Sequence, residues 1–148
     1  MSPAPKDRPD VRVFTEIGNI DQLMTNRLGR VLPHGQSAAQ FSLLVHFARR
    51  GGKESPAQLA KAFQVSKGAM TNILQKLEAQ GLVLIEADAE DGRKKLVSIT
   101  ERGLRAHDAG LMALRPQVEA MRSAFTEAEF QAALPFLTAL RTWLDENR

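Results

Sequence analysis

Three adjacent cations stand in the segment "EDGRKKLVSIT", residues 90–100, which places two acids before a glycine and three bases after it. A solvated turn needs polar residues, but it does not need three neighbouring positive charges. Lysines neutralise phosphates, and an arginine suits a narrow minor groove, where negative potential is concentrated. The segment therefore has the chemistry to meet a polyanion through Arg93, Lys94 and Lys95, and the residues upstream decide whether that partner is DNA.

A second polar set lies upstream, in "SKGAMTNILQK", residues 66–76. Hydroxyl and amide side chains can read base edges, whereas a carboxylate would be repelled by phosphates, and the first acid here is Glu78. We expect Ser66 to place a helix N-terminus against a phosphate. The remaining candidate DNA-binding residues are Lys67, Gly68, Ala69, Thr71, Asn72, Gln75 and Lys76. Any amphipathic helix has a polar face, so the setting of this helix matters.

The elements that must position these residues are two capped helices and a hairpin. Ser55 and Gln58 form a capping box with Pro56 at the first helical position, and after the short connection "QV" Ser66 caps a second helix that Gly81 stops. The apolar runs "LVLIE" and "KLVSI" then flank a turn at Asp91-Gly92. This order predicts a winged helix-turn-helix, whose second helix enters the major groove.

The acids of the turn fit DNA contact poorly. Asp91 is expected to orient Arg93 or to shape the turn, while Asp88 and Glu90 point away. A merely soluble turn is the alternative reading of this segment.

Flanking helices account for the rest of the chain. Ile17, Ile20, Met24, Leu28 and Val31 form one helical stripe, and "SAAQFSLLVHFARRGG" follows with a capping box at its start and a buried stripe of Phe41, Leu44, Val45 and Ala48. Thr100 is predicted to cap a helix from 101 to about 122 that is broken or kinked near Pro116, and "TEAE" opens a last helix bent at Pro135. The fold class is mainly α with a small β-hairpin wing.

At these residues the sequence resembles the MarR family of bacterial transcription regulators, over roughly residues 35–105. The wing pattern that carries the resemblance is Asp91, Arg93, Thr100 and Gly103. The resemblance implies a homodimer in which N- and C-terminal helices intertwine, a pseudo-palindromic operator of double-stranded DNA, and an inducing ligand between the dimerisation and DNA-binding parts. A small aromatic acid as that ligand is implied by the family alone. Gly68 departs from the family, which often has Ser or Thr there.

The domain organisation follows from these assignments. We expect a flexible arm over 1–10 and one MarR-like domain over 11–148, with the winged helix-turn-helix at 35–105 and dimerisation helices at 11–32 and 106–148. The last helix carries an apolar stripe too rich for a lone helix, which favours a subunit interface over core packing within one chain. The stripe is Phe130, Leu134, Leu137, Leu140, Trp143 and Leu144.

Composition narrows the class of protein. The chain has 148 residues, no cysteine and a net charge of +3, so thiolate chemistry is excluded and the charge is weak evidence for an anionic partner. No apolar run approaches the ~20 residues of a membrane span, and the N-terminus lacks a signal-peptide core, so we expect a cytoplasmic protein. His34, His46 and His107 have no ligand spacing. We expect no enzyme activity, cofactor or metal site.

The sequence thus predicts a homodimeric, sequence-specific DNA-binding transcription regulator, a repressor released by a small ligand. The alternative is a winged-helix module that binds protein and not DNA. A salt titration separates the two, because DNA binding through phosphates weakens steeply with salt.

Overall fold

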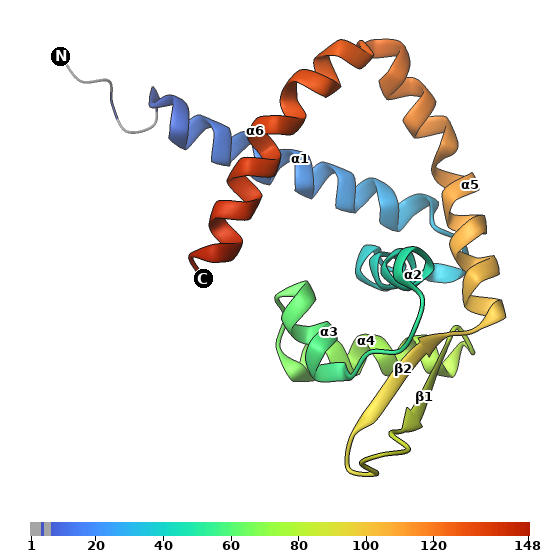
Figure 1. Ribbon diagram of the computed structural model, residues 1–148. Helices are drawn as coiled ribbons and strands as arrows, with labels where there is room; N and C mark the ends of the chain where they lie inside the picture. Colours follow the sequence, from blue (N-terminus) through green and yellow to red (C-terminus); the bar gives the residue numbers. More distant parts are fainter. Residues whose placement is uncertain (1–3, 5–6) are drawn as a thin grey trace. The chain divides into compact units, whose positions relative to one another are not determined.

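A computed structural model describes residue 4 and residues 7–148 (Figure 1). The elements run in the order α1 (Pro9–Val31), the short 3-10 helix η2 (Pro33–Gly35), α2 (Ala38–Arg50), α3 (Pro56–Phe63), α4 (Lys67–Ala79), β1 (Val83–Ala87), β2 (Lys95–Ile99), α5 (Glu101–Ala124) and α6 (Glu127–Glu146). They belong to two compact units, Met1–Ala113 and Leu114–Arg148, each of which is described by itself. The mainly helical winged helix-turn-helix predicted from the sequence is confirmed.

Serine caps fix where the central helices begin. Ser37 and Ser55 accept hydrogen bonds from the backbone N–H groups of Gln40 (3.1 Å) and Gln58 (3.2 Å), and both glutamines bond back to complete a capping box. Ser66 accepts from the N–H of Ala69 at 3.1 Å. Each such cap is worth about 1 kcal/mol, so the starts of α2, α3 and α4 are set by local sequence.

The core of the first unit lies where α2 packs on α4 and on the hairpin. Its most buried side chains are Leu43, Leu44, Phe47, Leu59, Met70, Leu74, Leu77 and Val97, each at most 2% exposed. In the predicted stripe of α2, Phe41 and Leu44 are buried, but Val45 and Ala48 are only partly buried. Leu43 and Phe47 were missed because α2 has neighbours on more than one side, which a single amphipathic stripe does not anticipate.

The wing is an antiparallel hairpin in which Val83 pairs with Ile99 and Ala87 with Lys95. A third short segment joins it: Glu54, just before α3, forms a β-bridge to Val97, with N–O distances of 3.1 and 2.8 Å. Lys53 also reaches Glu86 of β1 with an Nζ–Oε2 distance of 3.0 Å. The base of the wing is therefore tied to the start of the helix-turn-helix.

The start of α5 is hydrogen-bonded to, and closely packed on, the turn between α4 and β1. The Thr100 hydroxyl donates to the Gly81 carbonyl oxygen (2.6 Å) and accepts from the Gly103 N–H (3.0 Å), which confirms the predicted cap. A Cβ at Gly103 would lie 2.1 Å from the Leu82 carbonyl oxygen. Only glycine at position 103 allows α5 to approach the backbone of Leu82 this closely.

Of the two outcomes predicted at Pro116, a break is excluded, because α5 runs as one helix to Ala124; α6 likewise runs as one helix through Pro135. Both prolines are exposed in the single chain, so the carbonyl left without a helical N–H partner by each of them is accessible to water.

The N-terminal helix α1 starts at Pro9, two residues earlier than expected, because proline suits the first helical turn and Asp10 follows it there. Half of the proposed arm, residues 1–3 and 5–6, lies outside the described residues. The helix ends at Val31, before the expected "LPHG" stop, in which His34 and Gly35 take positive φ values of 60° and 67°.

The second unit contains the end of α5 and all of α6. Thr126 and Glu129 form the predicted capping box. The backbone N–H and then the hydroxyl of Thr126 donate to the Glu129 carboxylate and lower its pKa. The apolar stripe of α6 is exposed: Phe130, Leu134, Leu137, Trp143 and Leu144 are 42–60% accessible, and Leu140 is part-exposed.

Candidate nucleic-acid interface

Helix α4 presents its polar face to solvent. All of its predicted contact residues are exposed, namely Ser66, Lys67, Gly68, Ala69, Thr71, Asn72, Gln75 and Lys76. The opposite face holds Met70, Leu74 and Leu77 in the core. The helix is therefore anchored on one side and free to meet a ligand on the other.

The hydroxyl of Thr71 has a local partner. It donates to the Lys67 carbonyl oxygen at 2.9 Å, so its proton is used within the helix. The hydroxyl oxygen can still accept a hydrogen bond, and the methyl group can still contact an apolar base edge. Sequence reasoning treated Thr71 as a general hydrogen-bonding residue and missed this restriction.

The turn between α3 and α4 is tight because Gln64 takes a left-handed conformation, with φ of 57°. The N–H of Val65 then returns to the Ala60 carbonyl oxygen at 3.0 Å. A non-glycine residue at this conformation gave no sequence signal, although the shortness of "QV" did indicate a tight connection.

The wing tip is shaped by its acids. Asp91 accepts from the backbone N–H of Arg93 through its carboxylate (3.1 Å) and from the N–H of Lys94 through its carbonyl (2.9 Å). Asp88 similarly accepts from the N–H of Glu90 at 2.9 Å. Asp91 was expected either to orient the Arg93 side chain or to shape the turn. The bond to Arg93 reaches its backbone and not its guanidinium, so it shapes the turn.

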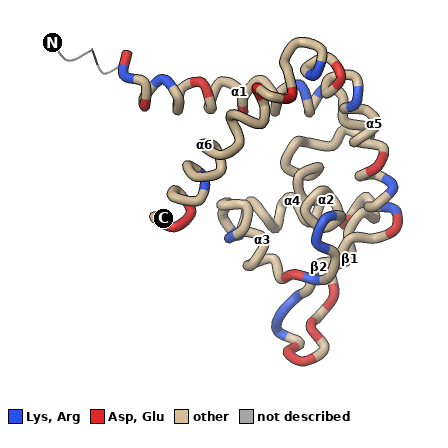
Figure 2. Tube along the Cα trace, turned by 45° about the horizontal axis from the view of Figure 1, so that its top comes forward, with Lys and Arg blue, Asp and Glu red and all other residues tan. Residues whose placement is uncertain are grey.

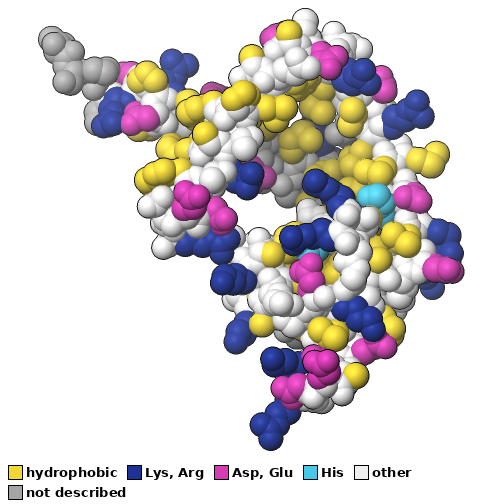
Figure 3. Space-filling view, viewed as in Figure 1, with side chains coloured by type: hydrophobic (Ala, Val, Ile, Leu, Met, Phe, Trp, Pro, Cys, Tyr) yellow, Lys and Arg dark blue, Asp and Glu magenta, His cyan; other side chains and the backbone are white. Residues whose placement is uncertain are grey.

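Positive and negative residues separate on the wing (Figure 2). The exposed Arg93, Lys94 and Lys95 lead into β2, while the acids lie on the tip and on the limb that follows β1. Figure 3 shows charged side chains crowded at the wing tip, at the bottom of the view. Arg93, Lys94 and Lys95 thus form a run of cations beside α4. Asp88, which was expected to point away, instead lines the same groove as these cations, because it follows β1 directly and lies opposite Lys94 in the hairpin.

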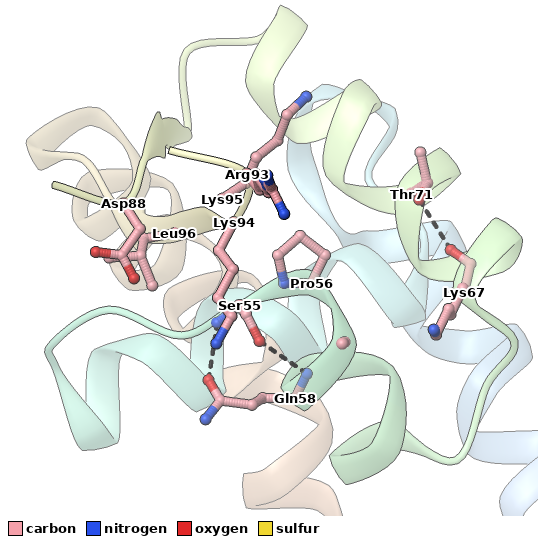
Figure 4. Close-up of a pocket in the computed structure, with 11 residues that line it drawn as sticks. Ser55, Pro56, Gln58, Lys67, Thr71, Asp88, Arg93, Lys94, Lys95 and Leu96 are labelled. Atoms are coloured by element: carbon pink, nitrogen blue, oxygen red, sulfur yellow. Dashed lines mark hydrogen bonds between the residues drawn. The ribbon is translucent and has the colours of Figure 1, made fainter. Parts of the chain in front are cut away.

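A groove of about 670 Å³ brings the two basic elements together. Figure 4 shows Lys67 and Thr71 of α4 on one side, the wing residues Arg93, Lys94 and Lys95 on the other, and Pro56 between them. Ser55 and Gln58 also line this groove, although the sequence indicated only a capping role for them. Both residues lie at the start of α3, directly before α4, and this position could have indicated from the sequence that they lie near the groove.

Other predicted residues lie apart from this groove. Gln75 lines a smaller pocket of about 300 Å³ between α4 and the hairpin, together with Thr71 and Lys95. The residues Gly68, Ala69, Asn72 and Lys76 line neither space, and they remain exposed on α4.

Two of the three histidines, His46 and His107, have structural partners. His46 Nε2 lies 2.9 Å from Glu54 Oε1, and its ring meets Phe63 edge-on at a centroid distance of 5.3 Å. His107 stacks on Phe41 at 6.2 Å. Within the described residues, no group of three or more His, Asp or Glu side chains is arranged to hold a metal ion.

Comparison with known proteins identifies the group to which this architecture belongs. A family model described as the MarR family matches residues 34–94. Over 99 residues, 67% of its length, the chain is 31% identical to the HTH-type transcriptional repressor NicR of Pseudomonas putida. The chain belongs to the MarR family of transcription regulators. The matched stretch spans 62% of the length of NicR.

Solved MarR structures extend the likeness over nearly the whole chain. A crystal structure of MarR is 26% identical, with a TM-score of 0.80 and coverage of 99% of this chain and 98% of that one. A mutant MarR from E. coli complexed with operator DNA shares the fold, with 23% identity, a TM-score of 0.78 and coverage of 94% and 99%. Among the helices described for the present chain, none combines the length and apolar character needed to cross a membrane.

Proposed function

We propose that this MarR-family chain is a homodimeric, sequence-specific DNA-binding transcription regulator that represses its target and is released by a small ligand. The observation that carries the proposal is the shared groove in which Lys67 and Thr71 of α4 face Arg93, Lys94 and Lys95 of the wing. The match to a named repressor and the shared fold with a MarR bound to operator DNA support the same assignment.

The two elements have different tasks in this proposal. Helix α4 enters the major groove and reads bases through Lys67, Ala69, Thr71, Asn72 and Gln75, with Lys76 facing the backbone and Gly68 allowing a close approach. Ser66 directs the helix N-terminus to a phosphate. The wing places Arg93 in the adjacent minor groove and Lys94 and Lys95 near phosphates.

A second copy of the chain is the proposed partner of the exposed apolar residues. Helix α6 has no buried residue, and α1 has none either. Exposed apolar side chains on α1 include Val11, Phe14, Ile20 and Leu23. Large exposed apolar surfaces of this kind mark interfaces, and a two-fold dimer presents two recognition helices to a pseudo-palindromic operator.

Release by a small aromatic acid rests on the family resemblance. Linkage requires that a ligand which weakens operator binding is itself bound more weakly by the DNA complex, by the same factor.

The salt dependence of DNA binding tests the function itself. Fluorescence anisotropy of the operator and of a random duplex should give a log Kd that changes linearly with log salt, with a slope of about 0.9 per phosphate contact. Lys94→Ala should reduce that slope by about one phosphate contact, while Arg49→Ala, which removes an exposed cation from the end of α2, should leave it unchanged. Binding that does not depend on salt, or no binding to any duplex, would favour the protein-interaction module.

A further inference from the structure

The loop between β1 and β2 extends away from the helices (Figure 1) and contains the pair Asp91-Gly92. This is the only place in the sequence where an aspartate or an asparagine precedes a glycine. An aspartate in such a pair is prone to attack on its side chain by the next backbone nitrogen, because glycine has no Cβ to crowd that nitrogen or to restrict its backbone. The wing tip therefore carries a reactive pair that DNA contact does not use.

The carboxyl of Asp91 is folded back over the backbone that follows it. Its Oδ1 accepts the N–H of Arg93 at 3.1 Å, while the carbonyl oxygen of Asp91 accepts the N–H of Lys94 at 2.9 Å. Gly92 lies between these bonded groups and is exposed, and no acceptor among the described residues pairs with its N–H. A side-chain carboxyl and an unbonded backbone nitrogen are thus held together in one tight turn.

Asp88 provides a comparison within the same loop. Its Oδ1 also accepts the backbone N–H two residues further on, that of Glu90 at 2.9 Å, but the intervening residue is Ala89. The methyl group of an alanine crowds the adjacent nitrogen and narrows the backbone dihedrals that it can adopt. The two aspartates therefore share this bond and differ in the residue that follows them.

We propose that Asp91-Gly92 is a site of spontaneous isomerisation to isoaspartate. The Gly92 nitrogen loses its proton and attacks Cγ of Asp91, so that the N–Cγ bond forms, a carboxyl oxygen leaves as water, and a five-membered succinimide results. Water then opens this ring at one of its two carbonyls. Opening at Cγ restores aspartate, whereas opening at the main-chain carbonyl breaks its bond to Gly92 and leaves the chain running through Cγ, as isoaspartate. No atom is gained or lost overall, and no oxidant or cofactor is required.

Isomerisation exchanges the two groups that shape the turn. The main chain becomes one carbon longer at residue 91, and the carbonyl that accepts from Lys94 becomes part of a free carboxylate. The oxygen that accepts from Arg93 then belongs to the main chain or is lost as water. The net charge is unchanged, so the cations that follow are displaced and not neutralised. The consequence for operator binding rests on the proposed function, whereas the reaction itself does not.

The test stores the purified full chain near neutral pH, below its Tm, and follows residue 91 over weeks. Denaturation and tryptic digestion release residues 77–93, a peptide that contains both aspartates. Electron-transfer fragmentation distinguishes isoaspartate from aspartate at each position. Methylation by a protein-isoaspartate O-methyltransferase with labelled S-adenosylmethionine measures the total. Isoaspartate should accumulate about tenfold faster at Asp91 than at Asp88.

Gly92→Ala is the matched variant, since a Cβ at residue 92 meets no atom within 4 Å and the φ of Gly92 is not positive. It should keep the Tm and slow the reaction at Asp91 by about tenfold. Asp91→Asn should close the same ring faster with loss of ammonia, which raises the mass of the tryptic peptide after hydrolysis. The proposal is overturned if Asp91 stays aspartate on storage, if Asp88 isomerises as fast, or if Gly92→Ala reacts at the parental rate.

Operator anisotropy before and after storage is a separate arm. The stored chain should bind the operator more weakly than the fresh chain, and Gly92→Ala stored alongside it should keep its affinity. An isomerised chain with unchanged affinity would overturn the consequence for the wing. A fresh chain that binds no duplex would count against the proposed function, while the reaction at Asp91 would still be read from the peptide.

Discussion

At the scale of single residues, the candidate interface separates contacts that read sequence from contacts that add affinity. Exposed amides and hydroxyls lie on α4, whereas the guanidinium of Arg93 lies on the wing. Base-edge hydrogen bonds discriminate between bases, while a minor groove is read chiefly by its width and potential. Substitutions in the two elements should therefore have different signatures.

Asn72→Ala is expected to relax discrimination at particular base pairs by about 1–3 kcal/mol, with little change in non-specific affinity. Arg93→Ala should weaken binding to many sequences and reduce the preference for A·T-rich flanks. Anisotropy with operator, point-mutated operator and random duplex measures both effects. If Arg93→Ala bound all three duplexes with unchanged affinity, the wing would be a structural turn that does not contact DNA.

Two glycines offer a matched test of packing. A Cβ at Gly110 would lie 2.2 Å from Cε2 of Phe41, so Gly110→Ala must displace a buried ring and should lower the free energy of unfolding by about 1–3 kcal/mol. Gly18 has no neighbour within 4 Å, and Gly18→Ala should raise that free energy by about 0.5–1 kcal/mol. Urea denaturation measures both; a stabilised Gly110→Ala would show that α5 does not press on Phe41.

The residue types of the interface could be predicted from the sequence because polar and apolar positions alternate with helical period along α4. Their local bonds could not. That the Thr71 hydroxyl is held by Lys67, and that Asp91 bonds to backbone, depends on rotamers that periodicity does not encode. The burial of Gln36 gave no signal either, since it results from elements distant in the sequence.

At the scale of elements, caps were the most predictable feature because a capping box is contained in four residues. The boxes at Ser37, Ser55 and Thr126 are all present. Pro116 left two outcomes open, a break or a kink, because the sequence does not show whether the rest of the helix can compensate for the lost hydrogen bond; α5 continues through it without a break. The bridge between Glu54 and Val97 joins residues too far apart for any local pattern to reveal.

The hydrogen bonds at the cap of α6 predict that the stability of the fold depends on pH through Glu129. The pKa of Glu129 lies below its ordinary value of 4.5, so its contribution to stability is present above that value and is lost as the pH falls through the lowered folded-state pKa. Thr126→Ala removes the hydroxyl donor but keeps the backbone N–H, and should raise the Glu129 pKa part of the way back. NMR titration of the carboxyl checks this, with Asp10, whose pKa is lowered by Arg8, as the unaffected control.

At the scale of the whole molecule, the exposed apolar stripe of α6 leads us to expect that damage to it reduces dimerisation and operator affinity together. Leu137 is 42% exposed in the single chain, and Leu137→Asp would place a charge in the proposed dimer interface. Light scattering should show a shift from dimer to monomer, and operator affinity should fall with it. A folded monomeric variant that keeps full operator affinity would contradict the proposal; Gln131→Asp, on the same helix outside the stripe, is the matched control.

The bridge between Glu54 and Val97 also determines what a protease could do to the molecule. Arg93, Lys94 and Lys95 form an exposed trypsin site at the wing tip, but Val97 is fully buried and the Thr100 hydroxyl is bonded to Gly81. A single cut after Arg93 should therefore give two fragments that remain associated in native gel filtration and separate only in denaturant. Such a nicked chain would have a cut wing tip but would keep its fold. Its DNA affinity and its stability could then be measured separately, which would distinguish the two contributions of the wing without any substitution.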